Sequence, residues 1–266
     1  MTDHPRPQWQ DLTTRDVAAL VARDPVVVLP LAAIEQHGPH LPLSTDLVIA
    51  RGLLDQAVAR VESGVTLSCL PPIAVGASAE HRRFPGTLSL APELLVETIC
   101  QLGAAVAASG AQRLVLFNAH GGNVGAVETA ALQLRDEWNL LVVKASYMTF
   151  SRPNVELPEA EWRHGLHGGA VETAMMRHLA PDLVRDDEVD RFTSNAEGLE
   201  QILGRLAPEG EASWAWRADD LHPSGTIGNA TLGTAALGAQ LVAHYGRILA
   251  EVLSDAARFP VERLQT

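Results

Sequence analysis

The sequence predicts an α/β fold of three layers, with a mostly parallel central sheet flanked by helices on both faces. Short apolar runs over residues 26–29, 113–118 and 140–145 are typical of strands, and the first reads as a strand buried on both faces. A helical pattern follows each of the first two runs, and a further apolar run follows that helix. Strand, helix and strand in this order form right-handed crossover units, and several such units build a parallel sheet.

The individual elements follow from hydrophobic spacing and from turn residues. Thr13 and Asp16 form a capping box for a short first helix. The run Val26–Leu29, continued by the apolar residues Ala32–Ile34, forms the first strand. The other expected elements are a helix over 46–61, a strand over 66–70, a loop over 76–90, a helix over 92–109, a strand over 113–118, a helix over 125–137, a strand over 140–145, a helix over 170–179, surface loops with a short helix over 181–208, and a helix over 231–257.

Composition indicates a soluble globular protein, which we expect to form a single domain over residues 1–266. Hydrophobic residues make up 47% of the chain, and the formal net charge is −12. That charge argues against nucleic acid and anionic membranes as partners. The N-terminal MTDHPRPQWQ has no apolar segment of a signal peptide, and no apolar run approaches the length of a membrane span. With only Cys69 and Cys100, no disulfide framework is expected, so we predict a cytoplasmic protein.

Candidate metal ligands follow the first strand directly. Glu35, His37 and Asp46 lie in a loop that also contains a glycine and two prolines. Side chains alternate along extended backbone, so we expect Glu35 and His37 to point the same way and Gln36 to point away. Carboxylate and imidazole groups together suit Zn²⁺, Mn²⁺ or Fe²⁺. Any one of these residues could instead be a surface group or a cap, and only partners elsewhere in the chain decide the matter.

Two later segments supply such partners. His120 follows the strand over 113–118, within the sequence AHGGN. The glycines could cradle a phosphate at a helix start, but the segment matches neither the P-loop nor the dinucleotide pattern. His167 and Glu172 surround the start of the helix over 170–179. A first-turn carboxylate also has a simple explanation in the helix dipole, and His167 could be a cap.

Two loops are candidates for contact with a substrate. The loop over 76–90 is long, and long loops in compact domains are often binding elements. The glycines after His120 allow close backbone approach by a substrate or by the metal loop. The tryptophan pair Trp214 and Trp216 could line a pocket or a subunit contact, although core packing explains it equally well. The candidate substrate-binding residues are Ser78, Glu80, His81, Gly121, Gly122 and Asn123.

Five motifs in order resemble the creatinine amidohydrolase (creatininase) family. The segments EQHGPHLPLSTD over 35–46 and EHRRFPGTLSL over 80–90 resemble its first metal motif and its EHxxFPGTLSL segment. The segments NAHGGN over 118–123 and HGGAVETA over 167–174 resemble NGHGGN and HAGxxETS. The segment PSGTIGNAT over 223–231 resembles PSGxxGDPT, with Asn–Ala in place of Asp–Pro. The resemblance covers most of the chain.

The resemblance implies a hydrolase that cleaves amides with two divalent metal ions, Zn²⁺ in the first place and Mn²⁺ or Fe²⁺ as alternatives. Glu35, Asp46 and His120 would hold one metal, and His37, Glu172 and the bridging Asp46 the other. His167 would be catalytic and would handle protons. Two metals roughly 3.5–4 Å apart share a hydroxide nucleophile and polarise a carbonyl. The resemblance also implies a homo-oligomer, namely a hexamer.

One departure bears on the substrate. The resemblance implies that creatininase proper has a segment similar to GHYEN where this chain has AHGGN. The glutamate of GHYEN is a metal ligand in that enzyme. Gly122 stands at that place here, so creatinine is not the expected substrate. We expect a non-peptide or cyclic amide of a small molecule. The alternatives are a peptidase that trims a short modified peptide, as in mycofactocin maturation, and a formamide hydrolase of flavin or deazaflavin biosynthesis. A metal-binding scaffold without activity is a third class, and the retention of every candidate ligand argues against it.

Overall fold

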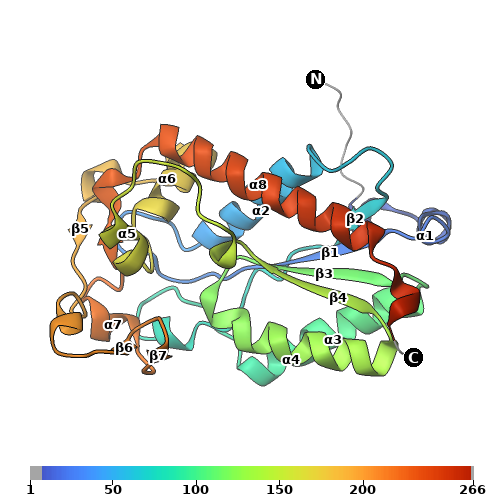
Figure 1. Cartoon of the computed structure of the whole chain (residues 1–266), viewed down its shortest axis with the longest axis horizontal. Helices are drawn as coiled ribbons and strands as arrows, with labels where there is room; N and C mark the ends of the chain where they lie inside the picture. The colour runs from blue at the N-terminus through green and yellow to red at the C-terminus, as the bar shows by residue number, and fades with distance from the viewer. Residues whose placement is uncertain (1–7, 265–266) are drawn as a thin grey trace.

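A four-stranded parallel sheet forms the centre of the molecule (Figure 1). The computed structural model describes residues 8–264, so most of the N-terminal segment assessed for a signal peptide lies outside the described residues. The strands have the order β2-β1-β3-β4, and every neighbouring pair is parallel. Their bounds are Val26–Leu31 for β1, Leu67–Cys69 for β2, Arg113–Asn118 for β3 and Leu141–Ser146 for β4.

Helices cover both faces of this sheet, so the predicted three-layer α/β fold is confirmed (Figure 1). The helices α2, α6 and α8 pack together on one face, while α3 and α4 pack together on the other. The short α1 lies beyond the end of the sheet where the strands begin. These helices span Thr14–Val21 (α1), Thr45–Val58 (α2), Pro92–Ala108 (α3), Val124–Trp138 (α4), Ala170–Leu179 (α6) and Ala235–Arg258 (α8).

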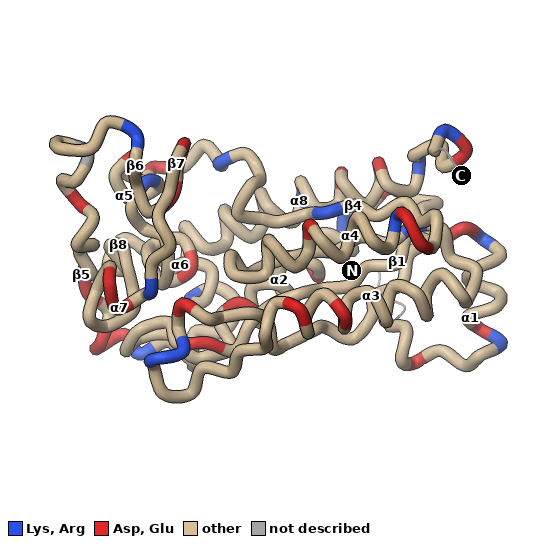
Figure 2. Tube along the Cα trace, turned by 90° about the horizontal axis from the view of Figure 1, so that it is seen from below, with Lys and Arg blue, Asp and Glu red and all other residues tan. Residues whose placement is uncertain are grey.

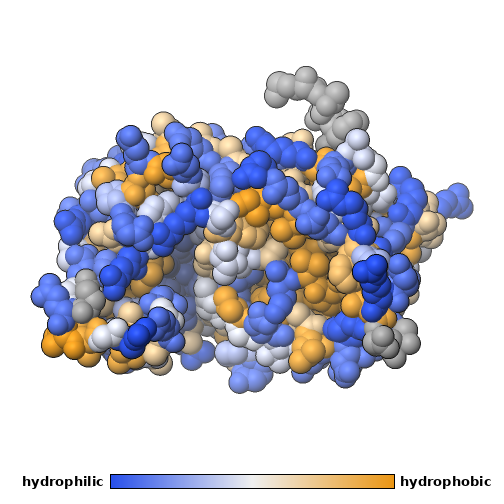
Figure 3. Space-filling model, in the orientation of Figure 1, coloured by the Kyte–Doolittle hydropathy of each residue, from blue (hydrophilic) through white to orange (hydrophobic). Residues whose placement is uncertain are grey.

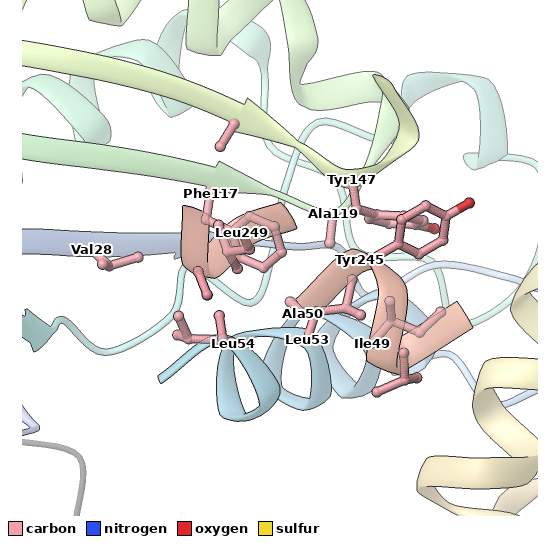
Figure 4. Packing of buried hydrophobic residues seen from close by; sticks show 14 of the residues in the cluster. Val28, Ile49, Ala50, Leu53, Leu54, Phe117, Ala119, Tyr147, Tyr245 and Leu249 are labelled. Atoms are coloured by element: carbon pink, nitrogen blue, oxygen red, sulfur yellow. The ribbon is translucent and has the colours of Figure 1, made fainter. Parts of the chain in front are cut away.

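The strand β1 separates two hydrophobic cores. Its residues are fully buried, and they alternate between the two faces of the sheet. Val28 packs with Phe117, Leu53 and Leu249 beneath α2 and α8 (Figure 4). Leu29 on the opposite face belongs to the core beneath α3 and α4. Helices cover both faces of the sheet, so a binding site is expected beyond the carboxyl ends of its strands.

Beyond that carboxyl end, the chain forms small elements (Figure 1). Trp214 and Trp216 are half-buried and pack against a small cluster that includes Leu221 and Ile227. Of the roles expected for the tryptophan pair, core packing is therefore the one that the contacts support. The small elements are α5 (Glu159–His164), β5 (Arg191–Phe192), β6 (Leu206–Ala207), β7 (Ala212–Ser213), α7 (Ala218–Leu221) and β8 (Gly228–Asn229).

Three boundaries differ from the prediction by three residues or more. The strand β1 ends at Leu31, whereas the apolar pattern continued to Ile34, which forms an isolated bridge with Leu88. The chain leaves the sheet there because the ligand loop must turn across its edge. The helix α2 ends at Val58 rather than at 61. The helix α8 begins at Ala235 rather than at 231, since Thr234 is its N-cap and a 3-10 turn precedes it.

The surface is mixed in character. Lys and Arg are distributed among Asp and Glu along the chain (Figure 2). The face shown in Figure 3 is hydrophilic around much of its border and more hydrophobic over β4 between α8 and α4. Leu132 and Trp138 of α4 are exposed. Among residues 8–264, no helix is both long enough and apolar enough to cross a membrane.

Candidate metal centre

The predicted metal ligands meet at the carboxyl end of the sheet, although they come from four separate segments. Glu35 and His37 lie in the loop after β1, and His120 directly follows β3. Asp46 and Glu172 lie in the first turns of α2 and α6, where the helix dipole favours a carboxylate. All five side chains are buried or nearly so.

Asp46 lies between two imidazoles and turns one oxygen to each. Its Oδ1 is 3.2 Å from His37 Nε2, and its Oδ2 is 3.2 Å from His120 Nδ1. Two ligands that bind one ion tetrahedrally at about 2.1 Å lie about 3.4 Å apart, so both spacings suit a shared metal. The carboxylate is thus placed to bridge two ions.

Backbone carbonyls determine which imidazole nitrogens are available. His37 Nδ1 lies 3.1 Å from the carbonyl oxygen of Glu35, and His120 Nε2 lies 3.0 Å from that of Ala77. A carbonyl only accepts, so each of these nitrogens carries the proton that it donates. The other nitrogen of each ring faces Asp46, and it is the nitrogen that a metal can bind in place of a proton. Metal-binding histidines are oriented in this way in many proteins.

The charges of the site are strongly coupled. Burial acts to lower the pKa of His37, but Asp46 with Glu172 and Glu35 outweighs it and raises the pKa to about 9. Burial likewise opposes Glu35 and Asp46 at His120, whose pKa rises to about 10. Burial raises the pKa of Glu35 to about 8, whereas the two histidines hold the pKa of Asp46 below its usual range against burial. The carboxylates therefore favour positive charge on His37 and His120, which either a proton or a metal cation at the ring nitrogen can supply.

The donor set fits a pair of divalent metals. Both carboxylate oxygens of Glu35 and Oδ2 of Asp46 are buried and accept no hydrogen bond from any described residue. Unpaired buried carboxylate oxygens are costly unless a cation compensates them. Carboxylates and imidazoles, without a thiolate among them, suit Zn²⁺, Mn²⁺ or Fe²⁺.

The predicted second ligand set comes together as a group. His37, Asp46 and Glu172 each offer a ligand atom, and these atoms lie within 4.8 Å of one another. Glu172 is the more distant member, since its Oε1 is 4.0 Å from His37 Nε2. Its carboxylate is oriented by two donors, the backbone N–H of Gly168 at 2.5 Å and the hydroxyl of Tyr147 at 3.4 Å.

The predicted first set converges less completely. Glu35 Oε2 lies 3.3 Å from His120 Nε2, on the side of the ring opposite to Asp46. Glu80 joins this pair, with its Oε1 3.7 Å from the same nitrogen. The three form a group of potential ligands within 4.8 Å. Glu80, which the sequence analysis assigned to substrate binding, thus also lies within reach of a metal.

His167 lies against the centre with a defined orientation. Its Nε2 lies 2.7 Å from the carbonyl oxygen of Gln36 and donates to it, so Nδ1 keeps its lone pair. Nδ1 faces Glu35 Oε1 at 3.8 Å, and the ring centroid lies 4.2 Å from that of His37. Burial, together with His37 and His81, keeps the pKa of His167 well below its ordinary value. The ring is therefore neutral near pH 7 and has a free basic nitrogen.

Comparison with known proteins agrees with this arrangement. The creatininase family model, described as creatinine amidohydrolase, matches residues 10–253. A mycofactocin precursor peptide peptidase of Mycobacterium ulcerans is 34% identical over 255 residues, which cover 94% of this chain and 90% of that protein. A creatinine amidohydrolase of Pseudomonas putida is 32% identical over 196 residues, which cover 67% of this chain and 74% of that protein.

This chain belongs to the creatininase family. It shares the fold of solved creatininases, and the predicted resemblance is confirmed. A creatininase described as the Mn form superposes with a TM-score of 0.77 at 25% identity, covering 96% of this chain and 100% of that one. The chain is accordingly a creatininase-family hydrolase.

The candidate substrate residues of this creatininase relative are mostly engaged within the protein. Asn123 is fully buried, donates to the Ala32 carbonyl and accepts from the Ala77 N–H. A Cβ on Gly122 would lie 2.1 Å from the Ala77 carbonyl oxygen, so glycine there admits the protein's own loop. Ser78 Oγ lies 3.3 Å from His120 Nε2. At Gly121, in contrast, a Cβ atom would have no other atom within 4 Å, so this position is open. Substrate contact by this set stays a prediction.

Gln36 has contacts that sequence reasoning did not anticipate. The alternation of side chains predicted only that it points away from Glu35 and His37. Its side chain is buried. Gln36 contacts His81 through its side chain and His167 through its carbonyl. Its position inside the EQHG motif was the available signal.

We expect metal binding to this family member to release protons. His37 and His120 hold protons at pH 7.5 in the metal-free protein because their pKa values are raised to about 9 and about 10. A metal displaces protons from its ligands, so roughly two to three protons per chain should leave, including one from Glu35. Calorimetric titration of Mn²⁺ in buffers of different ionisation enthalpy measures this number, and binding without proton release would contradict the ligand assignment.

The same raised pKa values give the metal-free protein a pH-dependent stability. Each histidine contributes stability that is complete below its ordinary pKa of 6.5 and lost as pH rises through about 9 to 10. The melting temperature of the metal-free protein should therefore fall between pH 7 and pH 10. Excess Mn²⁺ should reduce this fall, because the metal takes the place of the protons.

Proposed function

We propose that this protein is a two-metal-dependent hydrolase of an amide C–N bond. The observation that carries the proposal is Asp46, whose two oxygens each lie 3.2 Å from a histidine nitrogen that no backbone carbonyl holds. The opposite nitrogens of those histidines are held by backbone carbonyls. Such an arrangement prepares two adjoining cation sites with one shared carboxylate.

The residues divide into those that hold metals and one that carries a proton. Glu35, Asp46 and His120 would hold one metal, and His37, Asp46 and Glu172 the other. When bound, two divalent metals polarise an amide carbonyl and lower the pKa of an attacking water. Either Zn²⁺, Mn²⁺ or Fe²⁺ suits these donors, and Zn²⁺ is our first choice.

His167 would transfer the proton to the leaving nitrogen. Its Nε2–H is committed to the Gln36 carbonyl, so the proton moves at Nδ1. The neutral ring first accepts a proton at Nδ1 from the attacking water. It then donates that proton to the amide nitrogen, because an amine anion is a poor leaving group. The neighbouring carboxylate of Glu35, at 3.8 Å, stabilises the protonated ring in between.

The substrate is proposed to be a small non-peptide or cyclic amide. Gly122 leaves no side chain at the place where creatininase proper carries a ligand, and the loop carbonyl of Ala77 fills the space beside it. This supports a substrate other than creatinine. A formamide of flavin or deazaflavin biosynthesis belongs to the same class.

A short modified peptide is the second candidate. Curated mycofactocin precursor peptide peptidases, at 32–34% identity, match 92–94% of this chain. The creatinine amidohydrolase matches only 67% of it. The match to the peptidases extends over nearly the whole chain, so it includes the loops around the site. Such loops commonly select the substrate. This observation favours a peptide amide as strongly as the motif differences favour a small molecule.

Metal analysis combined with a substrate panel tests the proposal. We expect about two divalent metals per chain and loss of hydrolysis after chelation, since one bridging carboxylate serves both ions. The panel contains formamides, lactams and short peptides. A fully active preparation with one tightly bound metal would contradict the two-metal form. Metal binding without hydrolysis of any amide would favour a scaffold.

We also propose that the protein is cytoplasmic and assembles into a homo-oligomer, by resemblance a hexamer. The exposed Leu132 and Trp138 of α4, the helix that packs against the edge strand β4, support an interface between copies. Light scattering tests the assembly, since a single chain has a mass of 28.4 kDa.

A further inference from the structure

The loop over 76–90 places a second imidazole beside the metal ligand Glu35. The ring of His81 is buried, and its Nε2 lies 3.4 Å from Glu35 Oε1 and 3.9 Å from Glu80 Oε1. The other oxygen of Glu35 faces His120. Glu35 therefore lies between two imidazoles, and the proton on each ring decides whether that contact attracts or repels.

The side chain of Gln36 determines where the His81 proton lies. Its Oε1 accepts from the backbone N–H of Gly38 at 2.9 Å, and its Nε2 donates to the carbonyl of Gly225 at 2.8 Å. These two backbone groups fix the orientation of the amide, since an N–H only donates and a carbonyl only accepts. The second hydrogen of Nε2 then points to His81 Nδ1, at 2.8 Å. Because Nδ1 accepts, the ring proton lies on Nε2 and faces Glu35.

Close packing leaves this amide little freedom. Gln36 is 5% exposed, and a Cβ on Gly225 would lie 2.6 Å from its amide atoms. The His81 ring in turn stacks on the ring of His167, with centroids 4.2 Å apart. Gln36 also accepts from His167 through its carbonyl. One glutamine thus sets the tautomers of both stacked rings.

We propose that His81 is a positioning residue for the first metal site: its Nε2–H, with the nitrogen 3.4 Å from Oε1, attracts the carboxylate of Glu35 and so limits its orientation, under the control of Gln36. The inference rests on the proposed metal-dependent function. It replaces the substrate-binding role expected for His81. A donor beside a metal-binding carboxylate typically changes metal affinity 10- to 100-fold, as a rough range.

Substitutions at position 81 separate the donor from the ring. In His81→Phe the ring stacking is kept and the donor is lost, so affinity for Mn²⁺ at the first site should fall roughly 10- to 100-fold. In His81→Gln an amide N–H lies near the former Nε2, and affinity should remain near that of the parent. In His81→Asn the amide is too short to reach Glu35, so this variant should resemble His81→Phe and replaces it if the latter does not fold. Electron paramagnetic resonance of free Mn²⁺ measures both sites, and the second should change little.

The tautomer is measured separately. Nitrogen-15 spectra of histidine-labelled metal-free protein distinguish protonated from unprotonated ring nitrogens, and the His81→Phe spectrum assigns the signals. We expect His81 to be protonated at Nε2 and unprotonated at Nδ1. The opposite tautomer, or parent affinity in both His81→Phe and His81→Asn, would overturn the inference. A parent protein that binds no Mn²⁺ would instead refute the proposed function, while the tautomer would still be decided by the spectrum.

Discussion

Replacing Asp46 by Asn is expected to remove both metals and to lower hydrolysis about 10³-fold or more. The two oxygens of Asp46 face two different histidines, so one residue serves both sites. An amide offers one oxygen and no charge. A metal ion contributes several kcal/mol to the stabilisation of the transition state, and each 1.36 kcal/mol is tenfold in rate. Elemental analysis and turnover of the best substrate of the panel measure the two effects.

Two further variants show whether the loss is specific. Asp55→Asn removes the same charge from an exposed position of α2 and should leave metal content and turnover unchanged. Glu172→Gln should release only the metal beside His37, because Glu172 belongs to that group alone. If Asp46→Asn kept both metals at full occupancy, the bridging role would be wrong.

Replacing His167 by Ala is expected to leave both metals bound and to lower kcat roughly 10²–10⁴-fold, the usual contribution of a general acid–base group. Its Nδ1 carries the free lone pair and its Nε2–H is held by the Gln36 carbonyl, so no other side chain takes over the transfer. The loss should shrink for an activated anilide or ester, whose leaving group needs no proton. Bound metal and turnover of an ordinary and an activated substrate are the measurements.

The comparison of the two substrates discriminates among the possible roles of His167. Equal losses on both, with metal retained, would indicate that the ring positions the substrate. A fall in metal content would make His167 a ligand, a role that its grouping with Glu35 and His37 within 4.8 Å permits geometrically. His178→Ala, at an exposed position near the end of α6, is the matched control and should change neither quantity.

The sequence predicted candidate metal ligands where a short motif lies at the end of a strand or the start of a helix. Asp46 and Glu172 were candidates because of the family-like motifs around them, and both lie in the first turn of a helix. His120 was recognised because it directly follows a strand. The contacts of Gln36 were not foreseen, since they join it to His81 and Gly225, which lie far away in the chain. The sequence predicted substrate contact for Glu80 and did not show that it lies 3.7 Å from His120. That distance depends on how the loop over 76–90 folds back.

The sequence by itself determined the α/β class, the order of strands and helices, the family and the residues that can bind metal. These properties follow from periodicity and from short motifs, which need no contact between distant segments. Only the tertiary structure decided which imidazole nitrogens are free and which way Gln36 and Glu35 face. Those properties depend on hydrogen bonds donated to the carbonyls of Ala77 and Gly225, which lie far from their partners in the chain. A tautomer is set by the group on the other side of the ring, and that group is brought there by the fold.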